Sequence, residues 1–171
     1  MTDSTPREQS EERRERLIRP RQVTAHFKAW RRFLGAYNAV LPQIENALYA
    51  KRELPLTWYD VLFQLNEAPG QRLHTRDLAD ALLLSSKGVP RLIERIRAAG
   101  FVSREAPPRD PKSNVITLTA EGQRELTRAI PIVTQAIRAC FADHLSEEDA
   151  EALARILGRV QDATGRHLGS G

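Results

Sequence analysis

The chain has 171 residues and a formal net charge of +4; 41% of its residues are hydrophobic and 28% are charged. These values are typical of one globular domain with appendages, and the basic net charge is compatible with an acidic partner. No apolar run approaches the ~20 residues that span a bilayer, and no secretory signal is visible, so we expect a cytoplasmic protein without membrane contact. A single cysteine excludes an intrachain disulfide and a cysteine-based zinc site.

Residues 1–20 are polar, carry both charge signs and contain no large apolar side chain between Met1 and Leu17. Such a segment cannot bury enough surface to order itself, so we expect a disordered tail. The alternative is a basic arm that touches phosphates, although the glutamates interleaved with its arginines weaken that interpretation. We expect residues 21–167 to form a single domain.

Residues 21–50 carry apolar side chains at alternating spacings of three and four. This heptad seam predicts a long helix laid against another helix. Pro42 falls inside the seam and predicts a kink. A long helix with aromatic residues in so short a chain indicates dimerisation. The seam consists of Phe27, Trp30, Leu34, Tyr37, Leu41, Ile44 and Leu48.

Two shorter helices are predicted between residues 55 and 84. Thr57 is expected to cap the first, with Asp60 returning the hydrogen bond. Thr75 is expected to cap the second, which would support a helix-turn-helix. The apolar side chains of this second helix are Leu78, Ala79, Leu82 and Leu83.

The following segment predicts the other helix of the helix-turn-helix. We expect this helix to begin at Ser85 or Ser86 and to stop at Gly100, because glycine takes the left-handed cap conformation without steric cost. Its apolar residues are spaced for one buried face, and three basic residues lie nearly in line on the other face. The basic residues are Lys87, Arg91 and Arg95.

Two short strands are predicted at residues 101–104 and 115–118, joined by a loop rich in proline and charge. Helix, turn, helix and hairpin in this order outline a winged helix-turn-helix over about residues 55–120. The predicted fold class is therefore mainly α with a small β-hairpin wing, together with N- and C-terminal dimerisation helices.

The C-terminal part, about residues 120–167, predicts two helices. Thr119 is expected to cap the first, which runs to about Asp143 and bends at Pro131. The sequence Ser146-Glu147-Glu148-Asp149 is expected to cap the second. Cys140 falls on the apolar side of the first helix, which favours a place in the core over a redox sensor.

The segment LADALLLSSKGVPRLIERIRAAGFVSRE, followed by Arg-Asp-Pro-Lys and VITLTAEG, resembles the MarR family of bacterial transcription regulators. The resemblance includes LTWYDVLFQL upstream and the last two helices downstream, so it covers about residues 21–167. It implies a homodimer, built by the first and the last two helices, that binds double-stranded DNA.

The resemblance also implies which residues contact DNA. The family has an Asp-x-Arg pair in the wing, where the Arg enters the minor groove. This chain has Asp110-Pro111-Lys112, and the neighbouring Arg109 is the alternative groove residue. Gly88 and Pro90 depart from the small polar residues that the family often has. The predicted contacts are Thr75, Ser85, Ser86, Lys87, Arg91, Arg95, Arg104, Arg109, Asp110 and Lys112.

Family members often bind small aromatic or anionic effectors between the dimer helices and the winged unit. Trp30, Tyr37, Trp58 and Tyr59 are candidates for such a site, and the alternative is that they belong to the core. The four histidines lack metal spacing, and no enzyme signature or cofactor motif is visible.

The resemblance implies a sequence-specific regulator of transcription, a repressor rather than an activator, that binds a pseudo-palindromic operator. The alternative is a winged helix that docks an acidic protein partner.

Overall fold

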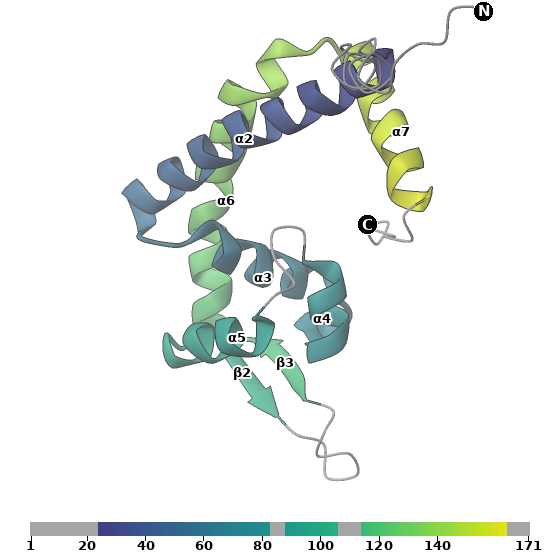
Figure 1. Cartoon of the computed structure of the whole chain (residues 1–171). Coiled ribbons are helices and arrows are strands. Elements are labelled where there is room, and N and C mark those ends of the chain that lie inside the picture. Colours follow the sequence, from purple (N-terminus) through teal and green to yellow (C-terminus); the bar gives the residue numbers. More distant parts are fainter. Residues whose placement is uncertain (1–23, 83–87, 106–113, 164–171) are drawn as a thin grey trace, which may run out of the picture. The chain divides into compact units, whose positions relative to one another are not determined.

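The structure is a computed structural model that describes residues 24–82, 88–105 and 114–163. It is mainly helical with one small sheet, which confirms the predicted fold class (Figure 1). In chain order the elements are α2 (Ala25–Arg52), α3 (Leu56–Glu67), η1 (Pro69–Gln71), β1 (Arg72–His74), α4 (Thr75–Ala81), α5 (Val89–Ala98), β2 (Val102–Glu105), β3 (Val115–Leu118), α6 (Ala120–Cys140), η2 (Ala142–His144) and α7 (Glu147–Ala163).

The chain divides into two compact units, and the boundary between them falls between Ala39 and Val40, inside α2. The predicted long helix is confirmed, with Pro42 inside it. In the second unit, Ile44 and Leu48 are buried in a cluster with Ala129 of α6. No helix in the described part of the chain is long and apolar enough to cross a membrane.

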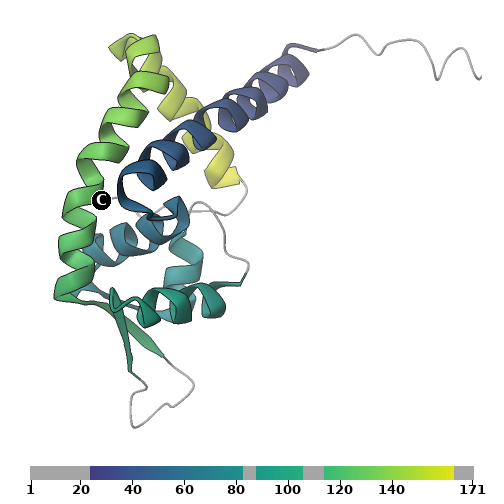
Figure 2. The same ribbon diagram turned by 90° about the vertical axis from the view of Figure 1, so that its left-hand side faces the viewer.

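A three-stranded antiparallel sheet, in the order β1-β3-β2, lies beside α4 and α5. The predicted hairpin forms, with Val102 opposite Leu118 and Glu105 opposite Val115. The third strand, β1, was not predicted, because three residues with one apolar side chain give no periodic signal. In both views α5 lies next to the β2–β3 hairpin (Figure 1, Figure 2).

The core of this part of the molecule is formed by side chains from three helices, the sheet and the first turns of α6. Its fully buried members include Leu62, Leu65, Leu78, Ile93, Ile96, Ile116 and Leu126. These residues come from the buried faces of both helices and strands. As a result, α3, α4, α5, the hairpin and the start of α6 share one apolar interior. That shared interior fixes where the polar faces of α5 and the hairpin lie.

The end of α5 follows the predicted glycine cap. Gly100 has φ +82°, its N–H bonds to the Arg97 carbonyl at 2.9 Å, and the Phe101 N–H bonds to the Ile96 carbonyl at 3.2 Å. This pair of bonds is a Schellman motif. The start of α5 differs from the prediction, because it begins at Val89 after Gly88, whose φ of +76° lies outside the helical region.

The two predicted caps at Thr57 and Thr75 are wrong. α3 begins at Leu56 after Pro55, and no side chain caps it. Thr75 is the first residue of α4, and its hydroxyl donates to the Asn114 carbonyl across the sheet instead. The Asn114 carbonyl is within hydrogen-bonding distance of the Thr75 hydroxyl. The hydroxyl therefore donates to this carbonyl instead of accepting a hydrogen bond from an N–H group of the helix.

The caps of the C-terminal helices are confirmed. The Thr119 hydroxyl accepts the Gly122 N–H at 3.0 Å at the start of α6. At the start of α7, the Ser146 hydroxyl accepts the Asp149 N–H while the Asp149 carboxylate accepts the Ser146 N–H. α6 ends at Cys140, three residues before the expected Asp143, and Cys140 is partly buried against an apolar cluster.

Candidate nucleic-acid interface

α5 places its apolar residues on one face and its basic residues on the other. Val89, Ile93 and Ile96 are buried, whereas Arg91 is exposed. Among the described residues Arg91 takes part in no ion pair. Its guanidinium is therefore available to a ligand at the surface, where it could form a bidentate contact with a base or phosphate.

Arg95 lies one turn further along α5 but leans toward α3. Its Cζ atom is 5.7 Å from the ring centroid of Trp58, which is a cation–π contact. The Trp58 ring also meets Phe101 edge to face, at a centroid distance of 6.1 Å and an angle of 79°. Arg95 therefore joins the end of α5 to α3, a contact that spacing along one helix could not reveal.

Glu94 connects α5 to the hairpin. One of its carboxylate oxygens accepts Nη1 of Arg104 on β2 at 2.7 Å. The other accepts both Nε and Nη2 of Arg97, at 3.0 and 2.8 Å. The hydrogen bond from Arg104, and then that from Arg97, lowers the pKa of the Glu94 carboxyl below its ordinary value. We call these three side chains the Glu94 bridge.

Thr75 ties the other strand of the hairpin to α4. Its backbone N–H and its hydroxyl both donate to the Asn114 carbonyl, at 2.9 and 3.2 Å. Asn114 is the residue before β3, so this contact holds the point where the chain returns from the wing loop. Both ends of that loop are thus attached to helices of the helix-turn-helix.

The predicted DNA contacts fall into three groups. Arg91 is exposed as expected, while Thr75, Arg95 and Arg104 are exposed or partly exposed side chains with partners inside the molecule. Glu94, which organises the hairpin side, was missed; an acidic residue among the arginines of this helix was the available signal. The remaining residues, Ser85, Ser86, Lys87, Arg109, Asp110 and Lys112, lie outside the described residues.

The four aromatic effector candidates belong to different units of the chain. Trp30 and Tyr37 lie in residues 24–39, and Trp58 and Tyr59 lie in the second unit. Trp58 and Tyr59 pack against both apolar clusters of that unit, and burial raises the pKa of Tyr59. This packing favours the core interpretation for these two.

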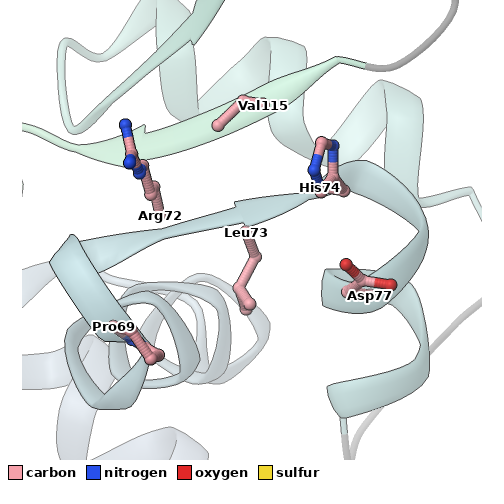
Figure 3. Close-up of a pocket in the computed structure, with 6 residues that line it drawn as sticks. All are labelled: Pro69, Arg72, Leu73, His74, Asp77 and Val115. Atoms are coloured by element: carbon pink, nitrogen blue, oxygen red, sulfur yellow. The ribbon is translucent and has the colours of Figure 1, made fainter.

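A hollow of about 440 Å³ lies beside β1 (Figure 3). Arg72 and His74 project to one side of the strand and Leu73 to the other. Its lining contains none of the four aromatic candidates; the lining residues are Pro69, Arg72, Leu73, His74, Asp77 and Val115. Among the described residues no group of three His, Cys, Asp or Glu side chains could hold a metal ion.

A three-stranded sheet with a β-hairpin beside a helix-turn-helix defines the winged helix-turn-helix class. Two solved structures from Streptomyces coelicolor are similar to this chain. AbsC, a MarR family transcriptional regulator, is 26% identical with a TM-score of 0.77, and the match covers 86% of this chain and 100% of that one. Sco3205, a MarR family regulator solved in complex with DNA, is 28% identical with a TM-score of 0.76, covering 84% and 91%.

The sequence comparisons agree with this likeness. Residues 53–112 match the model of the MarR family. An HTH-type transcriptional regulator of Bacillus cereus is 28% identical over 118 residues, which are 69% of this chain and 77% of that protein. The chain is therefore similar to MarR family transcriptional regulators in both sequence and fold, in line with the resemblance of its sequence motifs.

Proposed function

We propose that the chain is a homodimeric regulator that binds a pseudo-palindromic operator in double-stranded DNA and acts as a repressor. The observation that carries this proposal is the exposed basic face of α5 beside a hairpin that is anchored to α4 and α5. In this arrangement α5 enters the major groove and the wing reaches the flanking minor groove. The complex of Sco3205 with DNA supports DNA as the partner.

Arg91 is the described residue that we assign to direct contact with DNA. It is exposed, lies near the start of α5, and makes no ion pair among the described residues. Arg95 and Arg104 lie on the same side of the fold, but each already has an aromatic or carboxylate partner. We therefore assign those two to holding the DNA-binding surface in shape.

The homodimer is supported by apolar side chains that a single chain leaves exposed. Phe27, Trp30 and Tyr37 in α2 are about half exposed, at 51%, 54% and 46%. Ile137 of α6, Phe141 directly after it, and Ile156 and Val160 of α7 are also exposed. A second copy of the chain would remove this surface from water, which is favourable by about 25 cal/mol per Å² of apolar area.

A small aromatic or anionic effector remains part of the proposal, and so does the single domain over residues 21–167. An effector that binds one spacing of the two α5 helices better than another would shift the affinity for DNA. Such coupling is typically worth about 1–3 kcal/mol.

The test is fluorescence anisotropy of the purified protein with duplex DNA from its own promoter region, beside a scrambled duplex, at several salt concentrations. Tight binding to the promoter duplex alone, with a steep loss of affinity as salt rises, is the expected result. Weak and equal binding to both duplexes would contradict sequence-specific regulation and leave an acidic protein as the partner.

The homodimer has its own test. Leu34→Asp places a charge on the heptad seam of α2, whereas Ala36→Asp places the same charge off the seam on the same helix. Light scattering should give a monomer for the first variant and a dimer for the second. A dimer in both cases would contradict the assignment of this helix to the interface.

A further inference from the structure

We infer that Glu94 is a positioning residue for DNA recognition: through Arg104 it locks the wing to α5, so that the helix and the hairpin dock as one body. The inference rests on the proposed DNA-binding function. It gives a role to an acidic side chain on a surface that electrostatics alone would make entirely basic.

The geometry of the bridge supports a lock rather than a loose ion pair. Both carboxylate oxygens of Glu94 are engaged, one by Arg104 and the other by Arg97. Arg97 is three residues further along the same helix. Its ion pair with the other carboxylate oxygen therefore restricts the orientation of the Glu94 carboxylate. The oxygen that faces the hairpin is thereby fixed toward Arg104, and charge-assisted bonds of this kind are directional.

The position of Arg104 in the hairpin extends the lock to both strands. Arg104 is opposite Ile116, and only one further pair, Glu105 with Val115, precedes the end of the described ladder. The bridge therefore acts close to where the wing leaves the sheet. Ile116 is fully buried in the core, so the strand pair that carries Arg104 is itself packed against the apolar interior.

A second contact holds the other strand independently. The backbone and hydroxyl of Thr75 both donate to the Asn114 carbonyl, one residue before β3. Glu94 thus bonds β2 to α5, and Thr75 bonds the residue before β3 to α4.

The direction in which one substitution changes the affinity for DNA distinguishes a positioning role of Glu94 from a purely electrostatic one. Glu94→Gln keeps the shape of the side chain and removes the negative charge that pairs with Arg97 and Arg104. If Glu94 only neutralises Arg104, this variant should bind DNA as tightly as the wild type or more tightly. If Glu94 holds the wing, the variant should bind more weakly despite its more favourable charge.

The experiment uses the duplex that the full-length wild-type protein selects from a randomised pool. Two altered duplexes accompany it, one changed at the central major-groove positions and one in the flanking A·T content that sets minor-groove width. We expect Glu94→Gln to lower the affinity for the selected duplex about threefold to tenfold, a size usual for residues that act through others. Discrimination between flanks should fall, and discrimination at the centre should stay.

Glu121→Gln is the matched control. Glu121 pairs with Arg124 three residues later on α6, as Glu94 pairs with Arg97, but no ion pair in the described part of the chain links it to the sheet. It should leave affinity and flank discrimination unchanged. Arg104→Gln approaches the bridge from its other end, and the double variant Glu94→Gln/Arg104→Gln should be no weaker than Arg104→Gln alone.

Three results would overturn the inference while leaving the proposed function in place. They are unchanged or tighter binding by Glu94→Gln, a loss spread equally over centre and flanks, and additive losses in the double variant. A wild-type protein that selects no duplex from the pool is a different result, because it removes the proposed function itself. Thermal melting of each variant separates a loss of fold from a loss of position.

Discussion

Two ionic contacts in this molecule both join a glutamate to arginine, but the exposed fractions of their glutamate side chains differ. Glu125 of α6 accepts two bonds from Arg52 at the end of α2, at 2.9 and 2.5 Å, and the Glu125 side chain is only 7% exposed. Glu94 also accepts several bonds from arginines, but its side chain is 41% exposed. The first contact joins two helices through a buried carboxylate, and the second joins a helix to a strand at the surface.

The difference teaches which property each contact controls. A charge that is buried without its partner is expensive, so the pair of Glu125 and Arg52 bears on the free energy of unfolding. An exposed pair contributes little to stability because water replaces it well. Its remaining effect is geometric, and the orientation of the hairpin is the geometry that Glu94 controls.

The largest expected effect comes from breaking the buried pair. Arg52→Ala leaves the Glu125 carboxylate, whose side chain is 7% exposed, without its bidentate partner and should cost about 2–4 kcal/mol of unfolding free energy, measured by urea denaturation. Glu121→Ala removes an exposed carboxylate from α6 and should leave the midpoint nearly unchanged. Equal losses in the two variants would show that burial does not decide the outcome.

The next effect comes from the contact between α6 and the end of α5. A Cβ atom on Gly122 would lie 2.1 Å from the Phe101 carbonyl oxygen, so Gly122→Ala should destabilise the protein by about 1–3 kcal/mol. Gly158→Ala in α7 meets nothing within 4 Å and should stabilise by up to about 1 kcal/mol, because alanine is the better helix former. A stable Gly122→Ala protein would contradict this close approach.

Arg91→Ala tests the basic face without touching either ionic contact. We expect a loss of about 1–3 kcal/mol in specific DNA affinity if Arg91 reads a base, with no change in melting temperature. The control is Arg138→Ala, which removes the same charge from the end of α6, where Arg138 pairs with Asp143 at the surface. Unchanged affinity for Arg91→Ala would remove this residue from the interface.

The smallest expected effect is on stability at the Glu94 bridge, and it depends on pH. Because the pKa of Glu94 is lowered from 4.5 in the folded protein, the bridge stabilises above that value and is lost as pH falls through the lower folded value. Glu94→Gln should therefore melt within about 2 °C of the wild type at pH 7 and identically once the pH has fallen below the folded pKa of Glu94. A large difference at low pH would contradict an ionic origin.

Much of this fold could be predicted because it is periodic. The apolar spacing of α2, α5 and α6, the glycine cap at Gly100 and the hydroxyl cap at Thr119 are local signals, and the structure confirms them. Strand β1 and the contact from Thr75 to Asn114 escaped prediction because each depends on a partner 39 or more residues away. Sequence distance hides such partners.

The candidate site divides in the same way. That Arg91, Arg95 and Arg104 occupy the surface follows from their spacing, but which of them is free does not. Arg95 meets Trp58, which is 37 positions earlier in the chain, and Arg104 meets Glu94 across the turn that ends α5. The sequence pattern shows where a positive charge lies, but only the folded structure shows whether that charge already has a partner.

The close approach at Gly122 also relates any rotation of α6 at its first turn to a displacement of its far end. The first turn of α6 rests directly on the backbone that ends α5, with Thr119 N–H bonded to the Phe101 carbonyl at 3.1 Å. α6 has 21 residues and is therefore about 30 Å long. A rotation of about 5° around this contact would displace the far end of α6 by about 3 Å, because the displacement equals the angle multiplied by the length of the helix. Conversely, a displacement of a few ångströms at the far end of a straight α6 would correspond to a tilt of a few degrees at its contact with Phe101.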